Sequence, residues 1–391
     1  MKILYTNFHQ GDGGGHTTYV MSLARILCQK SQVMVGAPRK SRLLAEAQAE
    51  PGLRTVDLEF KGNVFEQLAA LRRLRALVRQ ERFDVIHVNG SADHRLCMLA
   101  TLGMGRKRPF IVYTQHNDRD PSSVGARLRA KWGTNRVICV CSHTFRRMRQ
   151  SVFRNEDLRV VHNGVDTAKY RPACHDETAK ARSRFLPPAL RDRLVIGSNA
   201  GTADYKSWID MVAAVSLLPE SQRRQVALLI AGTMPGDEML SRVAALGMQD
   251  QVVFTGMLDN VEPVLAALDV GFVLSTRVET ISFACREMMA AGKPVIVTTV
   301  GGLPENVTEG RNGWLVPPES PAAVARTLSA ILANRGVLHA MGVDARSTAL
   351  KEFSLATFVG NTERVYRENA YVSSGSPSGS TCLHASDRRL R

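Results

Sequence analysis

Short apolar runs separated by segments of helical length predict a series of parallel β-α-β units. Strands buried on both faces of a parallel sheet are apolar throughout, whereas strands with one exposed face alternate apolar and polar residues. The runs interpreted as strands span residues 3–7, 32–36, 84–88, 110–114, 137–140, 158–161, 194–197, 226–231, 252–255, 270–274 and 295–299. This pattern predicts the α/β class, with doubly wound parallel sheets.

The clearest unit comprises the strand 270–274, a polar loop, a helix ending near Ala291 and the strand 295–299. Gly292 stands where helices commonly end in a left-handed residue, and Pro294 follows. Glu279 and Glu287 lie at the loop-to-helix end of this unit. Ligands bind beyond the carboxyl ends of strands in open α/β sheets, so both glutamates are candidate ligand-binding residues.

A glycine loop containing Gly13, Gly14 and Gly15 separates the first strand from a helix. Backbone N–H groups at the positive end of a helix dipole suit a phosphate group. The dinucleotide-binding pattern is broken, because His16 occupies its third glycine position. The strand 32–36 also lacks a following acidic residue for an adenosine ribose. Glycines that serve only a tight turn remain an alternative.

His116 follows the strand 110–114, a position from which a side chain reaches a cleft. There it could donate a hydrogen bond or carry a proton. We place a domain boundary after the turn 162–166 and interpret the run up to about Asp192 as linker-like. The predicted parts are a first α/β domain (1–170), a second α/β domain (171–355), a helix packing back toward the first domain (356–370) and a disordered tail (371–391).

Composition narrows the class of protein. The chain of 391 residues is 44% hydrophobic and 6% aromatic, and no window approaches 18 uncharged apolar residues. Its start leads directly into a strand without the pattern of a secretory signal. The seven cysteines are scattered and are expected to be reduced. We therefore expect a cytoplasmic protein, with peripheral contact at the inner face of the cytoplasmic membrane as an option.

The net charge of +15 is concentrated in the first half. Residues 1–170 contain 28 Lys and Arg but only 14 Asp and Glu, so this half is expected to face an anionic partner. An amphipathic helix over 64–82 presents Arg72, Arg73, Arg75, Arg79 and Arg82. It is either a crossover helix with a solvated basic face or a surface that docks on an anionic bilayer. Because neither a helix-turn-helix nor interleaved aromatic residues occur, nucleic acid is not expected.

Together these elements resemble retaining glycosyltransferases of family 4, over roughly residues 1–370. The specific motif is Glu279-Thr-Ile-Ser-Phe-Ala-Cys-Arg-Glu287, followed by Met-Met-Ala-Ala-Gly-Lys-Pro-Val-Ile and Gly-Gly-Leu-Pro-Glu. The glycine loop, His116, Asn163-Gly164-Val165-Asp166, Lys206 and Asn312-Gly313 stand in the expected order. The resemblance implies the GT-B fold, with two Rossmann-like domains that face a cleft. It also implies that the first domain (1–170) binds the acceptor and the second (171–355) binds the nucleotide sugar.

The resemblance also implies roles for individual residues. Glu287 would accept hydrogen bonds from the nucleotide ribose, which suits a carboxylate because it only accepts. Glu279 would face the donor sugar and Lys206 the diphosphate, where its charge assists the leaving group. The predicted catalytic residues are Glu279, His116 and Lys206, and the predicted donor-binding residues are Gly13, Gly14, Gly15, Asn199, Lys206, Ile281, Ser282, Phe283 and Glu287. No metal or other cofactor is expected.

Two departures from the family pattern stand out. No arginine precedes Lys206 at the usual position, and Thr280-Ile281 replaces the usual glycine-aromatic pair. Loss of one charge-assisted contact in the transition state would cost on the order of 3 kcal/mol. Asn199 is a candidate neutral donor in place of the arginine.

The sequence thus predicts transfer of a UDP- or GDP-linked sugar to a hydroxyl of an anionic, lipid-linked or glycan acceptor. Lipopolysaccharide or another surface polysaccharide is the expected product class. A GT-B sugar-nucleotide epimerase or phosphorylase remains the alternative.

Overall fold

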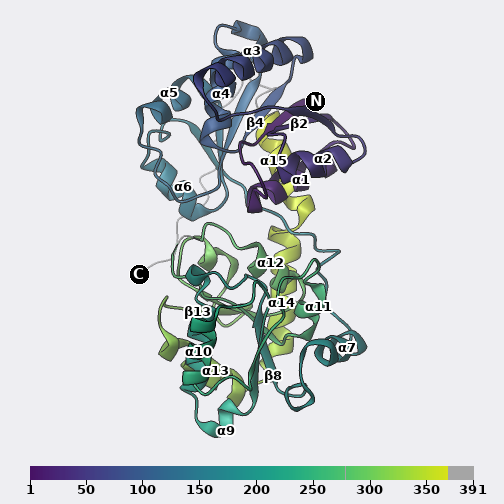
Figure 1. Cartoon of the computed structure of the whole chain (residues 1–391), viewed down its shortest axis with the longest axis vertical. Coiled ribbons are helices and arrows are strands. Elements are labelled where there is room, and N and C mark those ends of the chain that lie inside the picture. The colour runs from purple at the N-terminus through teal and green to yellow at the C-terminus, as the bar shows by residue number, and fades with distance from the viewer. Residues whose placement is uncertain (278, 369–391) are drawn as a thin grey trace, which may run out of the picture.

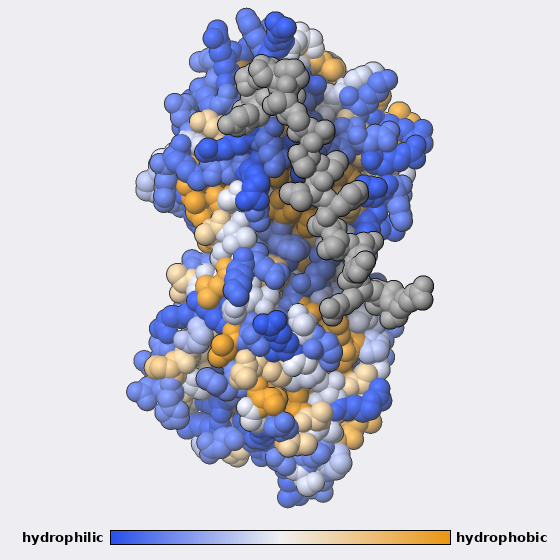
Figure 2. Space-filling view, turned by 180° about the vertical axis from the view of Figure 1, so that it is seen from behind, coloured by the Kyte–Doolittle hydropathy of each residue, from blue (hydrophilic) through white to orange (hydrophobic). Residues whose placement is uncertain are grey.

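Two α/β lobes, one above the other in Figure 1, make up the computed structural model, which describes residues 1–277 and 279–368. The N-terminal sheet has seven parallel strands in the order β3-β2-β1-β4-β5-β6-β7. The C-terminal sheet has six, in the order β10-β9-β8-β11-β12-β13. Seen from behind, a waist separates the two lobes (Figure 2). The predicted fold class, with two doubly wound parallel sheets, is confirmed.

The N-terminal lobe reverses its strand order beside β1. Its strands are β1 (Lys2–Thr6), β2 (Gln32–Ala37), β3 (Arg54–Asp57), β4 (Val85–Val88), β5 (Phe110–Gln115), β6 (Arg136–Cys139) and β7 (Asp157–Val160). Its helices are α1 (Gly14–Leu27), α2 (Arg42–Ala49), α3 (Val64–Glu81), α4 (Ser91–Thr101), α5 (Val124–Gly133) and α6 (Ser142–Arg149), with the 3-10 turn η1 (Gly105–Lys107). Because β1 lies between β2 and β4, the crevice for ligands opens beyond the ends of β1 and β4.

The C-terminal lobe repeats this plan. Its strands are β8 (Leu194–Ser198), β9 (Val226–Ile230), β10 (Val252–Phe254), β11 (Val270–Val273), β12 (Val295–Thr298) and β13 (Gly313–Val316). Its helices are α7 (His175–Phe185), α8 (Trp208–Ser216), α9 (Glu220–Arg223), α10 (Asp237–Ala245), α11 (Glu262–Ala267), α12 (Phe283–Ala290), α13 (Pro321–Ala333) and α14 (Val337–Glu352), with 3-10 turns η2 (Pro188–Leu190), η3 (Asp204–Lys206) and η4 (Leu303–Asn306). Here the order reverses between β8 and β11, which places the loops 199–207 and 274–282 together.

The interpretation of the segment up to Asp192 as linker-like is wrong, because it contains α7. A capping box between Cys174 and Glu177 begins this helix. Only Ala181 of α7 is buried, so the helix has almost no apolar stripe to reveal it in the sequence. Arg182 instead anchors it to Asp269 with two hydrogen bonds of 2.8 Å. Helix α14 was not predicted either. The prediction for Gly292 is confirmed, because this residue follows α12 in the left-handed conformation, at φ 73°.

Helix α3 buries less of its apolar stripe than its spacing predicts. Ala70, Leu74 and Val78 enter the core, but Val64 and Phe65 in the first turn are 69% and 83% exposed. The arginine face is also partly structural, since Arg75 donates to the carbonyl groups of Ala100 and Leu102 at the end of α4. Within the described residues, no helix has both the length and the apolarity needed to cross a bilayer.

The chain passes between the lobes twice, and the two crossings are hydrogen-bonded to each other. Val165 N donates to Phe353 O at 2.8 Å, and Leu355 N donates to Val165 O at 3.2 Å. Gly164 is required here, because a Cβ atom would lie 2.9 Å from Ser354 O. The second crossing leads into α15 (Leu355–Arg367), which packs against α1 in the N-terminal lobe. The expected tail, 371–391, lies outside the described residues.

A buried polar network anchors α15 in that lobe. The hydroxyl of Tyr366 lies 2.9 Å from Tyr5 Oη and 2.6 Å from His87 Nδ1. On the other side of the ring, His87 Nε2 lies 2.6 Å from Thr114 Oγ1, which also contacts the hydroxyl of Tyr19. The network connects the last helix with α1 and β5, the elements next to the glycine loop and His116.

Replacing Tyr366 with phenylalanine should destabilise the protein by about 1–3 kcal/mol, because it leaves buried polar partners unpaired. Urea unfolding measures this change. The matched control is Tyr205→Phe at a 44% exposed tyrosine, where we expect a change within about 0.5 kcal/mol. Equal stability of the two variants would contradict the anchoring role.

Candidate active site

Lys206 and Glu279 form an ion pair where the loops after β8 and β11 meet. Lys206 Nζ donates to Glu279 Oε2 at 2.6 Å, and Ser275 Oγ donates to the same oxygen at 2.7 Å. The carboxylate is 7% exposed. A 3-10 turn ending at Lys206 and a left-handed Ser207 aim the lysine at this point. The pair brings together two of the three predicted catalytic residues.

Glu287 lies in the second turn of α12 and not at the start of the helix, as the sequence suggested. Asn199 Nδ2 donates to its Oε2 at 2.6 Å. Burial raises the pKa of Glu287, and the hydrogen bond from Asn199 opposes this effect. Asn199 therefore contacts the carboxylate predicted to hold the ribose. Its own Oδ1 is buried with no hydrogen-bond partner among the described residues.

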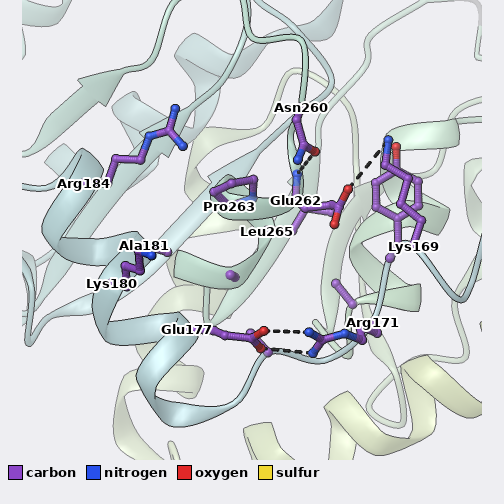
Figure 3. Close-up of a pocket in the computed structure, with 14 residues that line it drawn as sticks. Lys169, Arg171, Glu177, Lys180, Ala181, Arg184, Asn260, Glu262, Pro263 and Leu265 are labelled. Carbon is purple, nitrogen blue, oxygen red and sulfur yellow. Dashed lines mark hydrogen bonds and ion pairs between the residues drawn. The ribbon is translucent and has the colours of Figure 1, made fainter.

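A cavity of about 360 Å³ lies beside Glu287, between α7, α11 and the segment that enters the C-terminal lobe (Figure 3). Tyr170 lines it and also contacts Glu287, and Ala291 lines it one turn further along α12. Four cationic side chains surround it, together with two carboxylates: Lys169, Arg171, Lys180 and Arg184, and Glu177 and Glu262. Arg171 pairs with Glu177 at 2.6 Å, as Figure 3 shows. The mixture of apolar and cationic lining suits an anionic ligand with a flat ring.

The glycine loop faces the start of α12. Gly13 (φ 66°) and Gly14 (φ 49°) are left-handed, and Gly13 is the N-cap of α1. A Cβ atom on Gly15 would lie 3.5 Å from the ring of Phe283, the first residue of α12. Ser282 caps α12 by accepting from Cys285 N at 3.2 Å, and Ile281 precedes it. Two helix N-termini thus approach each other across the lobes, which favours a bound anion.

His116 lies at the end of β5, as expected from the sequence, and contacts the C-terminal lobe through its backbone. Its carbonyl oxygen accepts from Thr280 Oγ1 at 2.7 Å, so the threonine that replaces the family's glycine makes an interdomain bond. The imidazole packs against that of His16, with the ring centroids 4.2 Å apart and the ring planes tilted by 41°. Burial lowers the pKa of His116 well below the usual value.

Arg286, within the Glu279–Glu287 motif, is a structural residue that the sequence did not reveal. It is fully buried, and its Nε donates to Asn306 Oδ1 at 2.8 Å. Nη1 donates to Asn163 O at 2.7 Å, and the guanidinium lies 4.1 Å from the centroid of the Phe353 ring. Burial lowers its pKa to about 10. The signal for Arg286 that the sequence offered was a single arginine on a helix face that is otherwise apolar.

Glu305 from the Gly-Gly-Leu-Pro-Glu segment caps a helix of the other lobe. Its oxygens accept from Ser142 N and His143 N, both at 2.7 Å, at the start of α6. His162 Nε2 lies 3.3 Å away. These hydrogen bonds outweigh partial burial and lower the pKa of Glu305 to about 2.

The described residues contain no group of three or more His, Cys, Asp or Glu side chains placed to hold a metal ion.

Near Glu279, a smaller cavity of about 270 Å³ is lined by Asp118 and His143 from one lobe and by Arg277 from the other. Arg277 thus brings a positive charge to the cavity that Glu279 also lines.

Two switch points that face each other across two parallel-sheet lobes define a GT-B glycosyltransferase that uses a nucleotide sugar. Residues 13–169 match the family described as Glycosyltransferase Family 4, and residues 193–334 match Glycosyl transferases group 1. The chain belongs to glycosyltransferase family 4.

Known relatives cover most of the chain. The N-acetyl-alpha-D-glucosaminyl L-malate synthase of Bacillus anthracis is 25% identical over 76% of this chain and 78% of the relative. A GDP-mannose-dependent alpha-(1-6)-phosphatidylinositol monomannoside mannosyltransferase of Mycolicibacterium smegmatis is 27% identical over 91% and 95%. Anabaena HepE in complex with UDP has a similar fold, with a TM-score of 0.82 at 20% identity, over 94% of this chain and 100% of HepE.

Replacing Glu305 with glutamine should destabilise the protein at neutral pH. The pKa falls from an ordinary value of 4.5 to about 2 on folding, so the carboxylate stabilises the fold above about pH 4.5. This contribution is lost as the pH falls toward 2. We expect a difference on the order of 2–3 kcal/mol at pH 7 that shrinks below pH 4. Urea unfolding of both proteins across this range measures it, and a difference independent of pH would contradict the assignment.

Proposed function

We propose that this glycosyltransferase moves a sugar from UDP or GDP to a hydroxyl of an anionic cell-envelope acceptor, with retention of configuration. The observation that carries the proposal is the Lys206–Glu279 pair, which stands beside the Glu287–Asn199 pair at one switch point. The glycine loop of the opposite lobe approaches the same helix start. A donor bound there would contact both lobes.

In this proposal Glu287 accepts hydrogen bonds from the ribose hydroxyls. The nucleoside extends toward the cavity beside Tyr170, whose mixture of cationic and apolar lining residues suits it. Donor binding draws Lys206 from Glu279 to the diphosphate, where its charge stabilises the leaving group. Glu279 is then free to accept from hydroxyl groups of the sugar.

The transfer step breaks the bond between the anomeric carbon and the diphosphate oxygen. The acceptor oxygen forms the new bond on the same face, and its proton passes to the departing diphosphate. We propose this route because Glu279 is paired with Lys206, and Asp118, which lines the same small cavity, is itself paired with His143 and Arg147. Lys206 and the two helix N-termini provide the positive charge, so we expect the reaction to proceed without a metal.

The charge of the N-terminal half and the names of two relatives indicate an anionic acceptor. Two relatives act on anionic acceptors by name, L-malate and a phosphatidylinositol monomannoside. The basic N-terminal half of this chain is consistent with an acceptor of that kind. We propose a lipid-linked precursor of lipopolysaccharide or another surface polysaccharide, modified at the cytoplasmic face of the membrane.

Product mass from a panel of UDP- and GDP-sugars with cell-envelope extract tests this function. We expect one nucleotide sugar to yield a glycosylated product, in EDTA as well as with Mg²⁺. Glu287→Ala should weaken nucleotide binding at least tenfold by calorimetry, because it removes the acceptor for the ribose hydroxyls. Epimerised donor without added acceptor would instead establish an epimerase, and activity that requires Mg²⁺ would contradict the metal-free route.

We further propose that the start of α3 docks the enzyme on an anionic bilayer. Val64, Phe65 and Leu68 are exposed there, with Arg72 and Arg73 exposed on the following turns. Exposed apolar side chains beside cations are typical of helices that lie in the interface of anionic membranes. Lys61, just before α3, lies 4.3 Å from the ring centroid of Phe8, in the segment between β1 and the glycine loop.

Flotation with liposomes measures this contact. The protein should bind vesicles that contain anionic lipid more than neutral ones, and Phe65→Ser should lower the bound fraction several-fold. Leu217→Ser, at a 59% exposed leucine of the C-terminal lobe, serves as the control and should not change it. Equal binding to neutral vesicles, or equal effects of the two substitutions, would contradict docking through α3.

A further inference from the structure

Asn89 lies at the end of β4, beside the switch point of the N-terminal lobe, and its side-chain amide has a fixed orientation. Its Nδ2 donates to Thr6 O at 3.0 Å and to His87 O at 3.4 Å. Both partners are carbonyl groups, which can only accept, so the nitrogen must point to them. The amide oxygen therefore faces His116, with Oδ1 2.9 Å from Nε2.

The backbone of Asn89 is held as firmly as its side chain. Asp93 Oδ2 accepts from Asn89 N at 2.8 Å and from Thr6 Oγ1 at 2.9 Å. Asp93 is fully buried, and burial raises its pKa to about 7. Asn89 itself is 1% exposed. No rotation of the amide is available that would preserve these contacts.

This orientation determines which nitrogen of His116 carries the proton. An amide oxygen only accepts, so Nε2 must be the protonated nitrogen. A neutral imidazole carries one proton, which leaves Nδ1 with a free lone pair. Because burial holds the pKa of His116 well below its usual value, the ring stays neutral at physiological pH.

We propose that Asn89 is a positioning residue that fixes His116 as the Nε2-protonated tautomer, so that Nδ1 accepts a hydrogen bond from a sugar hydroxyl. The part that concerns the sugar rests on the proposed function. His116 then differs from the sequence-based expectation, in which it donates a hydrogen bond or carries a proton. Its role is to select a hydroxyl group, which can donate, over a carbonyl or phosphate oxygen.

The surroundings of His116 keep it neutral. The imidazoles of His9, His16 and His87 each lower its pKa, and burial lowers the pKa of His16 to about 4 and of His87 to about 3. Tyr19 packs edge-on against its ring, Asp93 accepts from the backbone of Asn89, and Asp118, two residues along the chain, pairs with His143 and Arg147. A carboxylate in place of the Asn89 amide would act directly on Nε2–H and favour the charged imidazolium.

Nitrogen-15 NMR of the full chain, labelled at histidine, tests the tautomer directly, with His116→Gln to assign the signals. Between about pH 5.5 and 8.5 we expect His116 to report a neutral ring protonated at Nε2. In Asn89→Ala a population protonated at Nδ1 should appear. A ring that is charged or protonated at Nδ1 in the unsubstituted protein, or no change in Asn89→Ala, would overturn the proposal. This readout does not depend on sugar transfer.

The pH profile of kcat/KM tests the role in transfer. Asn89→Asp should raise the pKa of His116, and protonation then removes the Nδ1 acceptor at low pH. We expect kcat/KM of this variant to rise about tenfold from pH 6 to 8.5, beyond any change in the unsubstituted enzyme over that range. The double variant Asn89→Asp/His116→Gln should not show this extra rise. An equal loss at every pH would assign Asn89 a structural role only, and absence of transfer in the unsubstituted enzyme would contradict the proposed function alone.

Discussion

The buried guanidinium of Arg286 connects the donor-binding helix to both crossings of the chain between the lobes. Its partners are the Asn163 carbonyl of the first crossing, the Phe353 ring at the second, and Asn306 in η4. No carboxylate lies within hydrogen-bonding distance among the described residues, so neutral dipoles and an aromatic face solvate the charge. A buried cation that lost these contacts would be strongly destabilising. The geometry of the glutamate motif therefore depends on the interdomain junction.

The two carboxylates of the glutamate motif, Glu279 and Glu287, have different electrostatic environments. Glu279 is paired with Lys206, and the two opposite charges largely compensate each other. Burial raises the pKa of Glu287, which the Asn199 amide, the Tyr170 hydroxyl and the charge of Lys169 oppose. In the proposed mechanism, a ribose hydroxyl takes the place of the Asn199 amide without bringing in charge. The diphosphate, in contrast, competes with Glu279 for the ammonium group of Lys206.

Elements with a regular pattern of buried residues could be predicted from the sequence. Elements and side chains that are held in place by tertiary contacts could not. Most strands are apolar throughout because both faces of each sheet are covered, and this pattern made them predictable. Strand β3 was missed, because none of its four residues is buried and both of its ends are charged. Helix α7 has one buried residue and is held by Arg182 and Asp269, which leaves no periodic signal. The apolar residues at the start of α3 have the spacing of a buried helix face, but they are exposed. Glu279, Lys206 and Glu287 could be found from their motif, but Arg286 and Glu305 contact residues more than a hundred positions away.

The structure shows what the two departures from the family pattern change, at Thr280 and in the loop before Lys206. Thr280 stands where the family has glycine, and its hydroxyl binds the carbonyl of His116. The extra side chain thus adds a polar contact between the lobes at the residue next to Glu279. The missing arginine has no replacement in the loop before Lys206, and Asn199 in that loop is engaged with Glu287. In the proposed mechanism, charge that develops on the diphosphate is stabilised by Lys206 and by the N-termini of α1 and α12, which approach each other at Gly15 and Phe283. Because helix dipoles act only at short range, this mechanism requires the two lobes to be close together during transfer.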